Sequence, residues 1–178
     1  CVAIGFNAGT TETIGAGQNT SVGAYAGDIV TEGTNNTSIG YQADPSGATE
    51  SNEFTLGNSA VDTLRCNTQD IVALSDLRDK ENIEELPLGV DFLNKLRPVK
   101  FDWNRRDGSM QGVQQAGFIA QELDQAQQEA NAEEYMRLVL KSNPEKLESA
   151  YGKLMPVAIK AIQELSAQVK ELKSKLKH

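Results

Sequence analysis

Residues 4–60 contain one short motif four times: IGFNAG at 4–9, VGAYAG at 22–27, IGYQAD at 39–44 and LGNSA at 56–60. The motif recurs every 17 or 18 residues, and Gly, Asn and Thr are frequent between its short apolar pairs. A period of this length with turn-forming residues indicates strand, turn and strand rather than helix. The sequence therefore predicts a β-rich segment of four coils.

The coils have to stack, because a single coil can bury very little apolar surface. They can stack within one chain, or the same coil from several chains can be wound together. We favour interwound chains, a triple β-helix-like fibre end, since four small repeats offer little core alone. The triplets at 19–21 and 36–38 match the pattern of glycan acceptors, but we interpret Asn19 and Asn36 as residues of the repeat corners.

Charge divides the 178-residue chain near residue 75. Residues 1–74 contain eight acidic residues and one basic residue, whereas residues 75–178 contain 17 acidic and 16 basic residues. The net charge of −8 argues against a nucleic-acid partner, because phosphate binding relies on clustered Lys and Arg. No apolar stretch approaches the roughly 20 residues of a membrane span, so no membrane insertion is expected. We predict two domains, 1–74 and 75–178.

Metal and cofactor sites are not expected. Cys1 and Cys66 are too few for a disulfide framework, and neither has the spacing of a metal ligand pair. The stretch 102–107 is a poor calcium loop, because Arg105 and Arg106 stand where oxygen ligands are needed. Assembly in the cytosol agrees with this cysteine content.

The middle of the second domain predicts mixed secondary structure. Spaced apolar residues at 83–96 suggest a helix that Pro98 ends, residues 99–103 alternate as a strand with Trp103 as a core anchor, and 118–130 form a Gln/Glu-rich helix. The fold class is therefore α+β.

The C-terminal residues contain a heptad pattern, with apolar residues in alternating steps of three and four. We call these residues the seam: Met155, Ala158, Ile162, Leu165, Val169, Leu172 and Leu176. A helix packed on its own domain is one explanation. We favour a self-associating coiled coil over residues 155–176, because Lys and Glu flank the apolar stripe.

Ser75 and Lys80 are the candidates for nucleophile and base. The only histidine is His178, so a Ser/His/Asp triad is not available. On a helix, five residues would turn these two side chains about 140° apart, so they need a turn, an extended path or different chains. Taken alone, such a pair is more often a capping serine and a solvated lysine.

Four blocks of sequence add a family resemblance: SDLRDKENIEEL from Ser75, LNKLRPVKFDW, AGFIAQEL, and YGKLMPVAIKAIQEL. In content and order they resemble the self-cleaving C-terminal chaperone domain of bacteriophage tailspikes, tail fibres and neck appendages. The first family pattern is matched by Ser75, Asp76, Arg78, Lys80, Asn82 and Ile83, and a later one by Gly117, Ile119, Ala120, Gln121 and Glu122. The repeats at 4–60 also resemble the head repeats of trimeric autotransporter adhesins and the shafts of phage fibres.

The resemblance implies a homotrimeric fibre end whose C-terminal chaperone directs folding and then releases itself. Ser75 and Lys80 would be the catalytic dyad, supported by Asp76, Arg78 and Asn82, and the cut would fall between Leu74 and Ser75. The mature fibre would belong to the virion tail and bind a host-cell surface receptor, with the chaperone left in the host cytoplasm. Two alternatives remain open: a permanent trimeric adhesin without proteolysis, and a peptidase that acts on other proteins.

Overall fold

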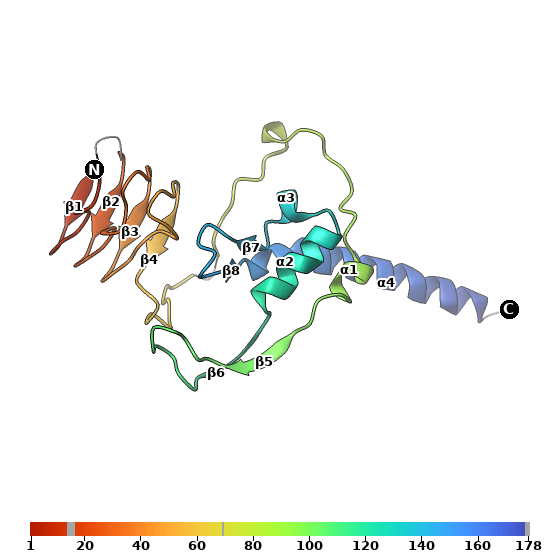
Figure 1. Cartoon of the computed structure of the whole chain (residues 1–178). Coiled ribbons are helices and arrows are strands. Elements are labelled where there is room, and N and C mark those ends of the chain that lie inside the picture. Colours follow the sequence, from red (N-terminus) through yellow and green to blue (C-terminus); the bar gives the residue numbers. More distant parts are fainter. Residues whose placement is uncertain (14–16, 69, 177–178) are drawn as a thin grey trace. The chain divides into compact units, whose positions relative to one another are not determined.

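The computed structural model describes residues 1–13, 17–68 and 70–176, and it contains both strands and helices (Figure 1). This mixed content confirms the coarse expectation of a chain with both strands and helices, while the finer α+β architecture stays a prediction. Contacts divide the chain into two compact units. Unit 1 comprises Cys1–Arg65, Asp102–Val113 and Ser142–Lys146, and unit 2 comprises Cys66–Phe101, Gln114–Lys141 and Leu147–His178.

Unit 1 is built on a parallel sheet in the order β1-β2-β3-β4 (Figure 1). The strands are β1 Val2–Ile4, β2 Thr20–Val22, β3 Thr37–Ile39 and β4 Phe54–Leu56. Equivalent repeat positions lie opposite each other, since Val2 pairs with Thr20, Thr20 with Thr37, and Thr37 with Phe54. Each repeat therefore forms one coil that returns the chain beside the previous strand.

Buried asparagines join the coils. Asn19 and Asn36 are each only 2% exposed. The Oδ1 of Asn19 accepts the backbone N–H of Asn36 at 2.9 Å, and the Oδ1 of Asn36 accepts that of Glu53 at 3.0 Å. Their amide nitrogens donate to the carbonyls of Gly33 and Glu50. Both asparagines therefore have the structural role that the sequence predicted.

Glycine at the end of each strand allows neighbouring coils to touch. Gly5 and Gly23 have φ angles of 136° and 135°. A Cβ added to Gly5 would lie 2.4 Å from the carbonyl oxygen of Gly23, and one added to Gly23 would lie 2.3 Å from that of Gly40. Both the backbone conformation and the close approach require glycine.

The coils stack within one chain, which corrects the prediction that the strands pair between interwound chains. The parallel pairs β1 to β2, β2 to β3 and β3 to β4 all form inside a single polypeptide. The apolar core that four repeats supply is small, but it is not the only contact between coils. Backbone hydrogen bonds and the buried Asn side chains supply the remaining contacts between coils, because each coil satisfies the polar groups of the next.

The strands expose an apolar outer surface. Ser21 and Ser38 point inward and are buried, whereas the alternate positions face outward. Ile4, Ile39 and Leu56 are 59%, 39% and 46% exposed. These outward residues form a ladder, since Ile4 is in register with Val22, Val22 with Ile39, and Ile39 with Leu56.

Unit 1 also includes the segment after Trp103. Arg105 donates to the backbone carbonyl of Ser59, and Ser59 donates its hydroxyl to Asp107 at 2.6 Å. The Arg105 guanidinium lies 4.6 Å from the ring centre of Trp103. Trp103 is half-buried and stacked by a cation, so the prediction that it anchors a hydrophobic core is corrected.

Unit 2 contains the remaining elements (Figure 1). In chain order they are the 3₁₀ turn η1 Leu77–Asp79, α1 Val90–Leu93, β5 Val99–Asp102, β6 Gln114–Gly117, α2 Ala120–Glu129, α3 Glu133–Met136, β7 Val139–Leu140, β8 Glu148–Ser149, the 3₁₀ turn η2 Tyr151–Leu154, and α4 Met155–Lys175. β5 pairs with β6, and β7 pairs with β8 antiparallel.

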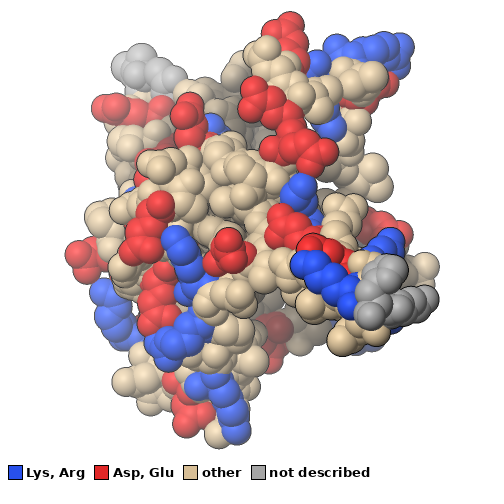
Figure 2. Space-filling view, turned by 90° about the vertical axis from the view of Figure 1, so that its right-hand side faces the viewer, with Lys and Arg blue, Asp and Glu red and all other residues tan. Residues whose placement is uncertain are grey.

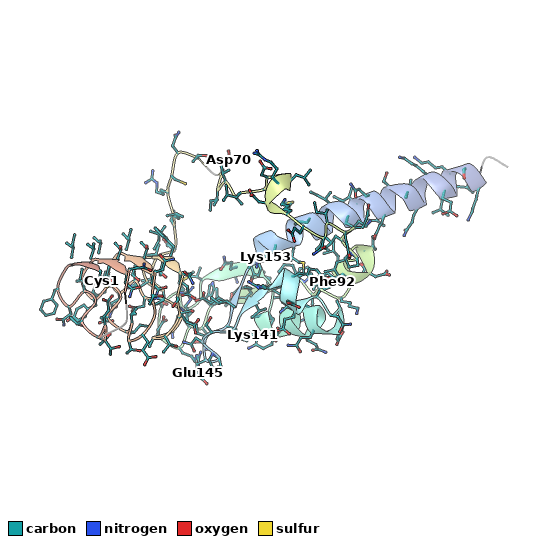
Figure 3. The ribbon with its side chains drawn as sticks, turned by 90° about the horizontal axis from the view of Figure 1, so that it is seen from above. Cys1, Asp70, Phe92, Lys141, Glu145 and Lys153 are labelled. Carbon is teal, nitrogen blue, oxygen red and sulfur yellow. The ribbon has the colours of Figure 1, made fainter. Side chains whose placement is uncertain are left out.

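The core of unit 2 lies between α1, α2 and α4. It contains Leu88, Phe92 (labelled in Figure 3), Leu123, Ala126, Met136, Leu138 and Val157. Gln127 is fully buried among them and has partners on both sides: it accepts the N–H of Leu138 at 2.9 Å and donates to Asp124 at 2.8 Å. Burial of this polar side chain is therefore compensated.

The predicted helix over 83–96 is much shorter in the structure. α1 spans only Val90–Leu93, and residues 80–88 are not helical. Pro87 and Gly89 explain the difference, because proline restricts the residue before it to extended conformations and glycine is a weak helix former. The strand at 99–102 and the helix at 120–129 agree with the prediction.

The long helix α4 has two different faces. Val157 and Ala161 are buried against the core, and Glu164 accepts the N–H of Val90 at 2.8 Å and so caps α1. The seam lies on another face, where Ile162, Leu165 and Val169 are 65%, 47% and 47% exposed. Most of the seam is therefore open to solvent in the single chain, whereas Ala158 is half-buried.

The charged surface is mixed in sign. On the face shown in Figure 2, Lys and Arg side chains are interspersed with Asp and Glu. Within the described residues, no helix combines the length and the apolar character needed to cross a bilayer.

Candidate functional site

The candidate site lies on an exposed segment that begins with Ser75. Asp76 precedes η1 in an extended conformation and accepts the backbone N–H of Arg78 at 2.9 Å. The Arg78 guanidinium returns to the same carboxylate, with Nε at 3.0 Å and Nη2 at 2.6 Å. These hydrogen bonds hold the pKa of Asp76 below and the pKa of Arg78 above their ordinary values. A local pair thus fixes the turn.

This turn brings Ser75 and Lys80 together. The Lys80 Nζ lies 2.7 Å from the Ser75 Oγ, and Lys80 itself has extended backbone angles after the single turn Leu77–Asp79. The chain thus follows one of the paths that the residue spacing left open, a turn followed by an extended residue. Their distance suits direct proton transfer between hydroxyl and amine.

Asn82 has a left-handed backbone conformation two residues after Lys80. Its φ is 50°, in the left-handed region that Asn adopts more readily than most residues. It redirects the chain two residues after Lys80. The supporting role predicted for Asn82 stays a prediction, and this conformation suits an asparagine.

A contact links the site segment to α4. Lys160 donates to Glu85 at 2.8 Å. This hydrogen bond, together with the charge of Lys160, lowers the pKa of Glu85. Sequence reasoning missed the pair, since the two residues are 75 positions apart.

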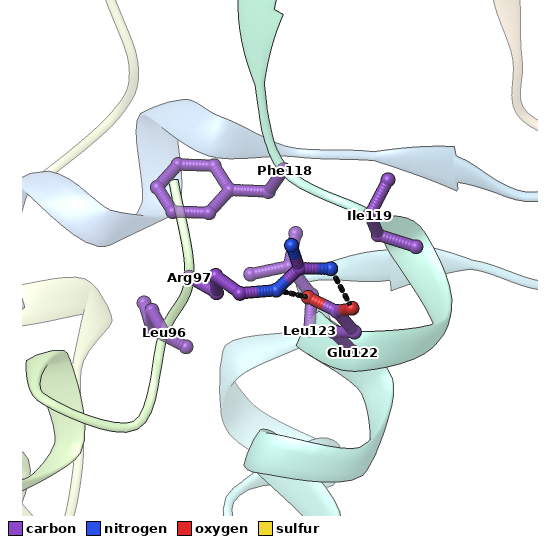
Figure 4. A pocket seen from close by; sticks show the side chains of 6 residues that line it. All are labelled: Leu96, Arg97, Phe118, Ile119, Glu122 and Leu123. Carbon is purple, nitrogen blue, oxygen red and sulfur yellow. Dashed lines mark hydrogen bonds and ion pairs between the residues drawn. The ribbon is translucent and has the colours of Figure 1, made fainter. Parts of the chain in front are cut away.

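The second family block, residues 117–122, lies at the N-terminal end of α2. Glu122 accepts two hydrogen bonds from the Arg97 guanidinium beside Phe118 (Figure 4), which raises the pKa of Arg97. The Tyr151 hydroxyl accepts a hydrogen bond from the N–H of Phe118 and donates one to the Phe118 carbonyl, both at 3.2 Å. A Cβ added to Gly117 would lie 2.9 Å from that hydroxyl, so a larger residue here would displace the Tyr151 side chain. This block therefore joins α2 to the segments before β5 and α4.

Metal ligands do not cluster in the described part of the chain. Searched over residues 1–13, 17–68 and 70–176, the His, Cys, Asp and Glu side chains form no group of three or more that would hold an ion. The Ser75/Lys80 pair is thus the arrangement with the clearest chemical capability.

Comparison with known proteins identifies this segment. Residues 75–132 match the family model described as the chaperone of endosialidase. The match supports a phage-type intramolecular chaperone in this segment. The resemblance inferred from the sequence blocks is thereby confirmed, and the match begins at Ser75. No curated protein and no solved structure matches the chain.

The match to the chaperone of endosialidase ends at Ala132, after α2. It includes Ser75, Lys80 and the residues of the second block, but not η2 or α4. The seam and the Tyr151 contacts therefore lie outside the matched segment, although they pack with it in unit 2.

Proposed function

We propose that the chain is the C-terminal part of a phage tail fibre or tailspike whose domain 75–178 trimerises the fibre and is then released by self-cleavage. One observation carries the proposal: the chaperone match begins at a serine whose Oγ lies 2.7 Å from the Nζ of Lys80. The mature fibre, residues 1–74, would remain in the virion tail and contact a host-cell surface receptor. The released chaperone would stay in the host cytoplasm.

The proposed cut is at the Leu74–Ser75 peptide bond. The Ser75 Oγ attacks the Leu74 carbonyl carbon through a five-membered ring, while neutral Lys80 removes the hydroxyl proton. The C–N bond breaks as the proton passes from Lys80 to the Ser75 nitrogen, which leaves an ester between Leu74 and Ser75. Water hydrolyses this ester and frees residues 75–178.

Assembly would activate the dyad. Lysine acts as a base only when it is neutral, and a solvated lysine is protonated near neutral pH. Ser75 and Lys80 are both exposed in the single chain. Packing of subunits around them would remove water and favour the neutral amine. Cleavage would then follow trimerisation and report correct folding.

Two exposed apolar surfaces support trimerisation. Every seam residue except the half-buried Ala158 is exposed, and so is most of the outward ladder of the β-coils. Burial of apolar area contributes about 25 cal/mol per Å², so both surfaces favour association with further copies. Since each chain completes its own coils, we propose a fibre in which complete coils pack side by side.

Substitution of the dyad tests the function. Ser75→Ala and Lys80→Ala should each leave a full-length chain, whereas the control Asp79→Ala should be cut like the parent, because the family pattern leaves this position unrestricted. Mass spectrometry of freshly purified protein distinguishes the intact chain from a fragment that begins at Ser75. Processing of Ser75→Ala at the parent bond would exclude the mechanism.

A permanent trimeric adhesin without proteolysis is the second candidate. It is favoured by the coils themselves, because strands that pair within one chain do not need a template to find their register. Finding an uncut parent chain after complete assembly would favour this function over the first.

A further inference from the structure

A groove lies beside the start of α4, within unit 2. Its cavity volume is about 480 Å³, and it is lined by uncharged side chains that include Leu93, Leu96, Pro98, Phe118, Met155 and Ala158. Ligand-binding pockets have volumes of about 300–1,000 Å³ and are mainly apolar. We call this feature the α4 groove. Its size and chemistry suit several aliphatic side chains.

The residues before the proposed cut have the matching chemistry. Ile71, Val72 and Leu74 are 95%, 91% and 99% exposed and lie on an extended stretch that follows Asp70 (labelled in Figure 3). We call residues 71–74 the IVAL segment. Three large aliphatic side chains in water favour any contact that covers them, because burial of each is worth about 1.5–3 kcal/mol.

The lining of the groove indicates which chain supplies this segment. Met155 and Ala158 line the groove and are also the first two residues of the seam. The groove is therefore continuous with the face on which α4 would meet other copies. A neighbouring chain that packs along the seam is brought to the edge of the groove.

We propose that the α4 groove of one copy binds the IVAL segment of a second copy and so positions the Leu74–Ser75 bond for cleavage. This inference rests on the proposed self-cleavage. Insertion of Leu74 would hold its carbonyl beside the Ser75 hydroxyl and exclude water from Lys80. The groove residues are positioning residues, since the bond is still broken by Ser75 and Lys80. Specificity for an aliphatic stretch before the cut follows from the apolar lining.

Gly152 offers a way to close the groove without disturbing the fold. It lines the groove, and a Cβ built on it meets nothing within 4 Å. Gly152→Phe should fill the cavity and slow cleavage roughly tenfold or more, the factor expected when one aliphatic side chain loses its burial. The matched control Glu134→Phe adds the same side chain at an exposed position of α3 outside the groove and should be cut at nearly the parent rate. Equal rates for both variants would overturn the proposal.

Substitution in the exposed segment tests the other partner. Val72→Asp should slow cleavage by a similar factor while the subunits still assemble, because Val72 contributes nothing to the core. Leu64→Asp is the control, since Leu64 is 70% exposed but lies outside the IVAL segment. An unchanged cleavage rate of Val72→Asp, measured by mass spectrometry over time, would also overturn the inference.

Mixed assembly decides which copy provides the groove. A Gly152→Phe chain is co-expressed with a Ser75→Ala chain that keeps its groove open, each with a different tag. Cutting of the Gly152→Phe chain only in the mixture supports binding between copies. A chain that stays uncut in the mixture would show that the groove acts on its own segment, against the proposal. The proposed function fails separately, if Ser75→Ala is cut or the parent is not.

Discussion

The β-coils and the C-terminal helix differ in how much of their interacting surface is paired within the single chain. In the coils, every strand finds its partner 17 or 18 residues away in the same chain, and buried Asn side chains complete the polar contacts. Helix α4 uses Val157 and Ala161 to pack on its own unit but leaves the seam exposed. The comparison teaches that one chain can complete the pairing of its coils, whereas the long apolar stripe of α4 is suited to a partner.

The largest effect is expected at the seam. Ile162→Asp combined with Leu165→Asp should convert the assembled protein to monomers, because both side chains are exposed in one chain and two buried charges in a coiled coil are very costly. Light scattering measures the mass, and circular dichroism should show an unchanged helix content. The exposed neighbour Ser166→Asp is the control. A trimer of the double variant would mean that the seam is not the contact between copies.

Substitution of a buried aromatic residue should have the next largest effect, a loss of folding stability. Phe92 is 4% exposed in the core of unit 2, and Phe92→Ala should lower the free energy of unfolding by about 3–5 kcal/mol. Phe54 in β4 is 65% exposed, so Phe54→Ala should cost far less in the isolated chain. Denaturant unfolding compares the two. Equal losses of unfolding free energy in the two variants would contradict the expectation that only Phe92 is part of a hydrophobic core.

The stability of the coils should depend instead on the hydrogen bonds of their buried polar side chains. Asn36→Ala removes the acceptor for Glu53 and the donor to Glu50, and the loss should be about 1–3 kcal/mol because buried backbone groups lose their partners. Thr10→Ala, at an exposed corner, is the control and should change stability little. Thermal unfolding followed in the β-sheet signal measures both. A neutral Asn36→Ala would show that backbone pairing alone holds the coils.

The smallest expected effect is a change in how folding stability depends on pH. Partial burial and the nearby charge of Asp28 raise the pKa of Asp44 above its ordinary 3.8, and one carboxylate oxygen of Asp44 has no partner. A raised folded-state pKa means that this group favours the fold at low pH, and that its contribution falls as pH rises through the folded pKa. Asp44→Asn should therefore raise the melting temperature slightly at pH 7 and remove this pH dependence. The exposed Asp62→Asn should do neither.

The sequence alone determined much of the architecture and the identity of the chaperone segment. A fixed repeat period specifies equivalent positions, so the strands at 2–56 and their glycines followed from spacing. The pattern from Ser75 to Ile83 showed the resemblance to the chaperone family, because the residues of this motif lie close together in the sequence. The heptad of α4 was also visible in the sequence, because residues three and four positions apart lie on the same side of a helix.

Tertiary structure alone decided how these pieces contact each other. Spacing did not reveal that the coils stack within one chain, because the same apolar positions suit both arrangements and only the observed strand pairs distinguish them. It did not reveal the Glu85 to Lys160 contact or the α4 groove, whose lining comes from segments far apart in the chain. Such features depend on which distant residues meet in space, and a periodic pattern specifies a face but not its partner.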